Sequence, residues 1–559
     1  MKKEVVWWNR LGKPQYGGEI VLWSDRNIVN FDPYYEAFYT QIMWTWMEGL
    51  AKEDWTKDPS VFDYKKFLRP NKYRKGQLAE SWEFTDPTTF VVHLRKGIYW
   101  QDIPPVNGRE FTADDVAYHF HRLYGLDNFL SPSPDHTSDD VLKSLMSVTA
   151  VDKYTVVFKW RINDSEYIMQ SLFAPNPAMV FEAREAVEKW GDLSDWHHAI
   201  GTGPFILTDF VSGSSATLIK NHNYWGYDER YPQNKLPYVD TIRLLIIPDK
   251  TEALEAMRKG KIDLISPVSL KDAQSMQRTN PEILRIPIPF RPTVSLDPRL
   301  DKAPFNDIRV RKAMQMAIDL PAISKDYYHS KVEPNSFAMH FITSSRDMKE
   351  WGFPYEEWPQ DLKDEYAYNP SASKKLLADA GYPNGFRTNI VADTAGDIDL
   401  LQIIKSYFAQ VGIDMEIRPM DSVSWHNFVM IGHKHDQMAQ RSELPQGHLF
   451  QPIRKLHEFH IGHATHRMIS DPVCDTFYPK AFAATSLDEV VKIYRDANEY
   501  IARQHFSISL LQPPFYALCQ PWLKGFNAQF GSIQMHAVLS FYLGRFWIDQ
   551  KLKEKIFPS

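Results

Sequence analysis

The segment 78–116 reads LAESWEFTDPTTFVVHLRKGIYWQDIPPVNGREFTADDV, and its pattern decides the expected fold. Phe90, Val92 and Leu94 alternate with other side chains, which is the period of a half-buried β-strand. Thr112 stands three residues before Asp115 and directly before an apolar series, so it predicts the N-terminus of a helix. The segment therefore predicts a strand followed by a loop and a helix.

The same two periods recur outside this segment. Alternating apolar residues predict further strands at 156–160 and 242–246. Asp307 precedes a helix whose apolar residues repeat at the spacing of one buried face. These residues are Val310, Ala313, Met314, Ala317 and Ile318.

A β-α-β unit is expected between residues 369 and 417. Asn369 and Pro370 are a cap and a first-turn proline, and Gly381 ends the helix that they begin. The pattern then predicts a strand at 388–392, a helix that ends at Gly412 and a strand at 413–417. Strands that alternate with helices over hundreds of residues indicate α/β lobes.

Composition bounds the class of protein. The chain has 559 residues, which favours three to five packing units. Hydrophobic residues make up 43% and charged residues 24%, and no stretch approaches the roughly 20 apolar residues that cross a bilayer. The net charge of −6 argues against nucleic acid as a partner, because it supplies no broad cationic surface. The two cysteines, Cys474 and Cys519, could pair or stay free.

Several ordered blocks carry a family resemblance. Residues 78–82, 90–100 and 108–116 form the strongest block, and further blocks stand at 201–205, 223–225, 253–263, 305–319 and 376–386. In order and spacing the chain resembles the peptide, dipeptide and nickel solute-binding proteins of ABC importers, the large three-domain class. The resemblance implies an α/β fold of two hinged lobes, like that of periplasmic binding proteins, with mixed sheets flanked by helices.

The resemblance also implies where the domains lie. We expect a discontinuous core domain of the first lobe in 1–50, 195–290 and 521–559, with an accessory domain in 51–194. The second lobe, which binds the ligand, is expected in 291–520. The implied function is capture of an oligopeptide-like solute between the lobes and its delivery to the transmembrane subunits of an ABC permease. Oligosaccharide and nickel-chelate binding remain alternatives within the family, and a hydrolase of peptides or glycans is the alternative outside it.

Peptide binders of this family use an acidic residue in the last domain to pair with the ligand's α-amino group. The corresponding stretch, 436–445, departs from the family pattern, and in it Glu443 and Arg441 are the candidate anion and cation. Trp44, Trp46, Trp425 and Trp522 are candidate platforms for a sugar or peptide, since flat rings bury ligand area at little entropic cost. The other candidate contacts are Asp25, Arg26, Asn27, Tyr39 and Gln512.

Histidines gather between His426 and His466, and His457, His460, His463 and His466 recur at every third position. Two imidazoles one helical turn apart can share a metal ion, but no carboxylate stands at the spacing of a zinc protease. We therefore expect no bound metal and no cofactor. Walker, nucleophile-elbow and dinucleotide-binding motifs are also missing from the sequence, so we do not expect an enzyme.

The resemblance belongs to exported proteins. The first ten residues, MKKEVVWWNR, contain no apolar core of a secretory signal. We expect a periplasmic or cell-surface monomer whose signal has been removed, with a lipid anchor as an open alternative.

Overall fold

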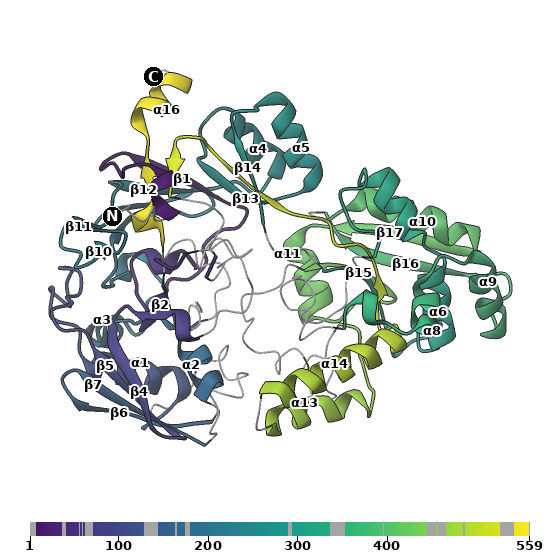
Figure 1. Ribbon diagram of the computed structural model, residues 1–559, viewed down its shortest axis with the longest axis horizontal. Helices are drawn as coiled ribbons and strands as arrows, with labels where there is room; N and C mark the ends of the chain where they lie inside the picture. The colour runs from purple at the N-terminus through teal and green to yellow at the C-terminus, as the bar shows by residue number, and fades with distance from the viewer. Residues whose placement is uncertain are drawn as a thin grey trace, which may run out of the picture. The chain divides into compact units, whose positions relative to one another are not determined.

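The computed structural model describes residues 7–35, 41–54, 56–58, 60–61, 71–127, 133, 144–161, 165–173, 179–288, 293–335, 353–394, 396–443, 456, 466–484, 487–525 and 542–557. The chain divides into two compact units (Figure 1). Unit 1 comprises Met1–Pro289 and Tyr516–Ser559, and unit 2 comprises Phe290–Phe515. The chain thus leaves unit 1 once and returns to it near its end.

A seven-stranded mixed sheet forms the core of unit 1. Its strand order is β14-β20-β13-β1-β12-β9-β8, so segments far apart in the sequence lie side by side. The central strand β1 runs parallel to both β12 and β13. The strands are β1 (Glu19–Ser24), β8 (Phe205–Val211), β9 (Ser215–Lys220), β12 (Thr241–Ile246), β13 (Leu264–Val268), β14 (Leu284–Pro287) and β20 (Tyr516–Cys519).

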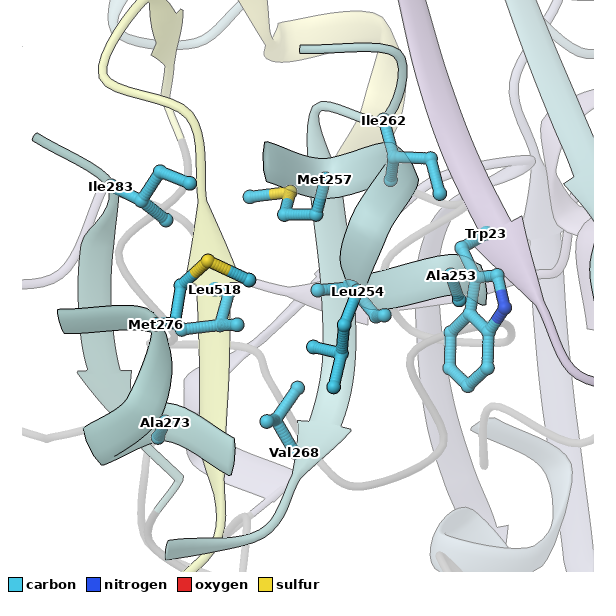
Figure 2. Close-up of a cluster of buried hydrophobic side chains, with 11 residues drawn as sticks. Trp23, Ala253, Leu254, Met257, Ile262, Val268, Ala273, Met276, Ile283 and Leu518 are labelled. Atoms are coloured by element: carbon cyan, nitrogen blue, oxygen red, sulfur yellow. The ribbon is translucent and has the colours of Figure 1, made fainter. Parts of the chain in front are cut away.

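Two helices, α4 (Lys250–Arg258) and α5 (Leu270–Thr279), cover one face of this sheet beside β13 and β14 (Figure 1). Asp249 and Ser269 cap them by accepting hydrogen bonds from the third residue along, Glu252 and Asp272. Both helices bury their apolar stripes in one cluster (Figure 2). Its members are Trp23, Ala253, Leu254, Met257, Ile262, Ile265, Val268, Ala273, Met276, Ile283 and Leu518.

A second sheet in unit 1 is antiparallel, in the order β4-β5-β7-β6. All four strands come from residues 79–160, which lie within the range 51–194 for which an accessory domain is proposed. The strands are β4 (Ala79–Asp86), β5 (Thr89–Leu94), β6 (Leu145–Asp152) and β7 (Thr155–Trp160). The helices of this region are α1 (Ala113–Tyr124), α2 (Ser165–Phe173) and α3 (Arg184–Trp190).

Short elements complete unit 1. They are β2 (Ala51–Glu53), β3 (Arg74–Gly76), β10 (Tyr227–Asp228), β11 (Tyr231–Lys235), β21 (Leu523–Lys524), β22 (Trp547–Ile548) and α16 (Gln550–Ile556).

Unit 2 is built on a five-stranded mixed sheet in the order β17-β16-β18-β15-β19. β16 runs parallel to β17 and β18, whereas β15 runs antiparallel to β18 and β19. The strands are β15 (Thr293–Pro298), β16 (Phe386–Asp393), β17 (Ile413–Met420), β18 (Met438–Glu443) and β19 (Ile508–Ser509). The helices are α6 (Ile308–Met316), α7 (Leu320–Ala322), α8 (Gln360–Tyr366), α9 (Pro370–Asp379), α10 (Ile398–Gln410), α11 (Ser422–Trp425), α13 (Cys474–Ala483) and α14 (Leu487–Gln504).

The elements expected from the sequence are present. Strands β5, β7 and β12 cover the three expected strands, and β16, α10 and β17 form the expected β-α-β unit with parallel strands. The backbone N–H of Thr112 donates to the Asp115 carboxylate over 2.9 Å, as expected at the start of α1. The helix after Asp307, α6, ends at Met316, two residues before the expected apolar stripe ends at Ile318. It ends early because Asp319 already caps the next helix, α7. Ala317 and Ile318 are buried nonetheless.

Two expectations about composition can be compared with the structure. Cys474 and Cys519 are both free and buried. Within the described ranges, no helix has the length and apolar character needed to cross a membrane.

Candidate functional site

The carboxyl ends of the parallel strands β1, β12 and β13 lie at one edge of the sheet in unit 1. Ligands of open α/β sheets bind outside the carboxyl ends of the strands, so this edge is the first place to look for a site. Backbone and side-chain bonds tie the edge together. Ile247 donates from its backbone to Ser24, and the Trp23 indole donates to the Ile247 carbonyl, each over 2.9 Å.

Three of the sequence-predicted contacts, Asp25, Arg26 and Asn27, follow β1 at this edge. Asp25 is exposed, and its carboxylate lies 3.7 Å from the Arg26 guanidinium. The Asn27 amide donates to Ser212 and accepts from the backbone N–H of Gly213, each over 2.8 Å. Asn27 therefore holds the turn between β8 and β9, while Asp25 keeps exposed oxygens. Their contact with a solute stays a prediction.

Lys250 stands at the same edge, and the sequence reasoning missed it. It is the first residue of α4, directly after the capping residue Asp249 and shortly after the end of β12 at Ile246. The ammonium donates to the Pro267 carbonyl over 2.6 Å and lies 4.0 Å from the centre of the Trp23 ring. A lysine on a helix normally indicates a solvated charge. The signal that could have found it is a cation placed on the first turn, where the helix dipole disfavours it.

In unit 2 the carboxyl ends of β16, β17 and β18 lie at one edge of the sheet. The Ser422 hydroxyl at the start of α11 donates to the Asp393 carboxylate at the end of β16 over 2.7 Å. Trp425 also lies here, 9% exposed, and its indole donates to the Val391 carbonyl over 3.4 Å. Its ring packs with Val391, Val429 and Ala439, so little of it is open to a ligand.

Arg441 and Glu443 lie on β18. Arg441 is buried, opposite Ser295 of β15. Burial lowers the pKa of His466, and the positive charge of Arg441 acts in the same direction. Arg441 is thus an interior cation of unit 2, not a surface one. Glu443 is the last residue of β18 and pairs with Thr293. Their contact with a solute also stays a prediction.

The remaining candidates are mostly interior. Trp522 is 0% exposed, and its indole donates to the buried Asp263 carboxylate over 2.6 Å, so neither face of its ring is open. Trp44 and Trp46 are also buried in unit 1, and Gln512 is buried in unit 2. Tyr39 lies outside the described residues.

Of the predicted histidine group, the structure describes His426, His433, His435 and His466. Among the residues with described positions, no set of three or more His, Cys, Asp or Glu is arranged to hold a metal. His435 and His466 instead lie in the interior of unit 2 with ring centres 6.3 Å apart. His466 Nε2 lies 2.7 Å from the buried Asp297 carboxylate.

Acid is expected to weaken unit 2 through His435. Burial lowers its pKa to about 4, with the charges of His466 and Arg299 acting in the same direction. As the pH falls from about 6.5 to 4, His435 binds a proton in the unfolded chain but stays neutral in the folded one. The free energy of unfolding therefore falls by up to about 1.4 kcal/mol per pH unit. Urea unfolding at pH 7, 5.5 and 4.5 measures this slope. His435→Leu should flatten it, and an unchanged slope in that variant would remove His435 as its cause.

Several known proteins are similar to this chain in sequence. The family model for bacterial extracellular solute-binding proteins, family 5 (middle), matches residues 74–441. Heme-binding protein A of Haemophilus influenzae is 25% identical over 498 residues, which cover 81% of this chain and 83% of that protein. Glutathione-binding protein GsiB of Shigella flexneri is 28% identical over 360 residues, or 62% of either chain.

Similarity also extends to solved structures. The oligopeptide-binding protein AppA of Bacillus subtilis, in complex with a nonapeptide, matches with a TM-score of 0.71 and 19% sequence identity. The match covers 96% of this chain and 100% of that one, so the two share a fold along nearly their whole length.

Proposed function

This chain belongs to the bacterial extracellular solute-binding proteins of family 5, and from that premise we propose that it captures a peptide-like solute for an ABC importer. The observation that carries the proposal is the family match over residues 74–441, which spans elements of both units. Membership confirms the resemblance and the fold class expected from the sequence.

Charge at the edge of the unit 1 sheet favours a peptide-like solute. Asp25 and Lys250, a carboxylate and an ammonium, stand beside the ends of its parallel strands. A peptide brings an ammonium, a carboxylate and a row of amides, so groups of both signs can recognise it. The relatives named above bind heme, glutathione and a nonapeptide, and the last two are peptides.

The alternatives receive less support. Oligosaccharides are uncharged and stack on exposed rings, whereas Trp44, Trp46 and Trp522 are buried. A nickel chelate would profit from a set of metal ligands, and the part of the chain that the structure describes contains no such set. Both solutes therefore enter the test below as competitors.

The mechanism we propose is binding without chemistry. In this class the solute favours the closed arrangement of two lobes, and moving such an equilibrium from 1:99 to 99:1 takes about 5.5 kcal/mol of preferential binding. The protein then acts as a monomer in the periplasm or at the cell surface, and its partner is the permease of the importer.

A ligand panel tests the proposal. At a concentration of 100 times its Kd, a ligand adds about 2.7 kcal/mol to the stability of the folded state, which a thermal unfolding scan detects. We expect peptides of two to nine residues to raise the midpoint, and we expect small-angle scattering to show compaction with the same peptides. Heme, Ni(II)-histidine and short β-linked oligosaccharides are the competing ligands. A shift with only these competitors, or a peptide recovered with altered mass, would reject the proposal.

A further inference from the structure

The residues around the Lys250 side chain do not explain why a cation stands at this position. Its ammonium has three N–H donors, and the structure assigns one of them to the Pro267 carbonyl. The Trp23 ring covers another side at 4.0 Å, in cation–π geometry. Among the described residues, no carboxylate lies within ion-pair distance of this ammonium.

Two carboxylates whose charges act on Lys250 have other partners. Asp25, after β1, lies 3.7 Å from Arg26, and Asp272 accepts a 2.8 Å hydrogen bond from the hydroxyl of Ser269 at the start of α5. Both carboxylates still act on Lys250 from a longer distance. They attract the ammonium of Lys250 but do not form an ion pair with it.

Holding a cation here costs stability. Lys250 is the first residue of α4, where the positive end of the helix dipole repels it. Burial lowers its pKa to about 8, although the charges of Asp25 and Asp272 act in the opposite direction. A methionine could cover Trp23 equally well without this cost. A cation that is buried at the carboxyl edge of a sheet, despite the cost of removing it from water, is typical of a functional group.

We propose that the Lys250 ammonium binds a carboxylate of the captured solute, with the Trp23 ring as the apolar side of this subsite. This inference rests on the proposed function and names the group that the solute must carry. The carboxylate accepts hydrogen bonds from the side of the ammonium that Pro267 and Trp23 leave open, and it supplies an anion at ion-pair distance.

The test uses trialanine and pentaalanine, each as the free acid and as the C-terminal amide, with titration calorimetry at pH 7. The wild-type protein should bind the acids more tightly than the amides. Lys250→Met should lose about 10- to 100-fold in affinity for the acids, since hydrogen bonds to charged groups contribute that much. The amides should bind both proteins alike.

Lys261→Met is the matched control. Lys261 is exposed and precedes β13, so it lies toward the opposite end of that strand from Pro267. Removing the charge of Lys261 should leave the affinities for the acids and for the amides unchanged. Equal losses in the two variants would overturn the inference, because they would reflect net charge alone.

The thermal midpoint and the pH dependence of affinity distinguish a lysine that binds the solute from one that only stabilises the fold. Without ligand, Lys250→Met should unfold at a higher temperature than the wild type, because it removes a desolvated charge; a structural lysine would give a lower midpoint. Affinity for the acids should fall between pH 7 and 9 in the wild type and hold in Lys250→Arg, which stays charged.

The outcomes distinguish the two proposals. Amides that bind the wild type as tightly as the acids, or acids that bind Lys250→Met unchanged, overturn the carboxylate subsite and leave peptide capture standing. If the wild type binds none of the four peptides and no peptide of the thermal-unfolding panel raises its midpoint, peptide capture is rejected, and the carboxylate subsite with it.

Discussion

Replacing Asp32 by alanine is expected to lower the free energy of unfolding of unit 1 by about 3–5 kcal/mol, since it breaks a buried ion pair. Asp32 is 0% exposed, and both of its oxygens accept hydrogen bonds from the Arg122 guanidinium of α1, over 2.8 and 2.6 Å. The backbone N–H of Leu193 donates to the same carboxylate over 2.9 Å. Removing it leaves a buried cation with one carboxylate fewer.

The network around Arg122 extends to Glu182 and His119. Arg122 donates to Glu182 over 3.1 Å, and His119 Nδ1 lies 2.6 Å from the other Glu182 oxygen. Burial opposes ionisation of Glu182, but His119 and Arg122 outweigh it and lower the pKa to about 2. Because this pKa lies below that of the unfolded chain, the contribution of Glu182 is present above about pH 4.5 and is lost as the pH falls toward 2.

Urea unfolding followed by circular dichroism measures the loss in Asp32→Ala. Asp114→Ala is the control, because Asp114 is exposed on the first turn of the same helix that carries Arg122. We expect the control to lose less than about 1 kcal/mol, the size of a helix-dipole contribution. A similar small loss of unfolding free energy in Asp32→Ala would contradict the prediction, because it would show that Glu182 alone compensates the charge of Arg122.

Unit 2 has a comparable buried centre at Asp297, and Asp297→Ala is expected to cost about 3–5 kcal/mol there. Asp297 is 0% exposed on β15 and accepts a hydrogen bond from the Ser295 hydroxyl over 2.8 Å. His466 Nε2 lies 2.7 Å and Arg467 Nη1 lies 3.5 Å from one carboxylate oxygen. Since Arg467 is also 0% exposed, losing Asp297 takes one carboxylate away from a fully buried guanidinium.

Hydrogen exchange followed by mass spectrometry locates this loss. Peptides of unit 2 should exchange faster in Asp297→Ala, while peptides of the seven-stranded sheet in unit 1 should keep the wild-type rate. Asp414→Ala is the control, because Asp414 pairs with Arg387 in the same unit but is 60% exposed and its partner 91% exposed. An exchange pattern in Asp297→Ala that matches the control would contradict the prediction.

Local signals in the sequence were sufficient to predict many elements. The residues around Thr112, Asp307 and Asn369 predict helix starts, and each of the three precedes a helix in the structure. Caps and apolar periods depend on neighbours three or four residues away, so they are visible in the chain itself. The end of α6 was less clear, because Ala317 and Ile318 stay buried after the helix has stopped.

The candidate site was only partly visible. Asp25, Arg26 and Asn27 follow a strand, and the structure places them at the carboxyl edge of the unit 1 sheet. The ring of Trp522 makes it a candidate in the sequence, but burial is a property of the folded unit, and its indole donates to Asp263 inside the core. Lys250 was overlooked because its two contacts, Trp23 and Pro267, lie 227 and 17 residues away along the chain.

The sequence by itself determined the family, the α/β class and most helix starts, because these depend on short-range patterns and on ordered blocks of residues. Tertiary structure alone decided that β1 lies between β12 and β13, and that Lys250 therefore stands over Trp23. It also decided that Arg122 meets Asp32 across 90 residues of chain. The physical reason is that burial and charge pairing depend on distances in space, which strand pairing sets between segments that the sequence keeps far apart.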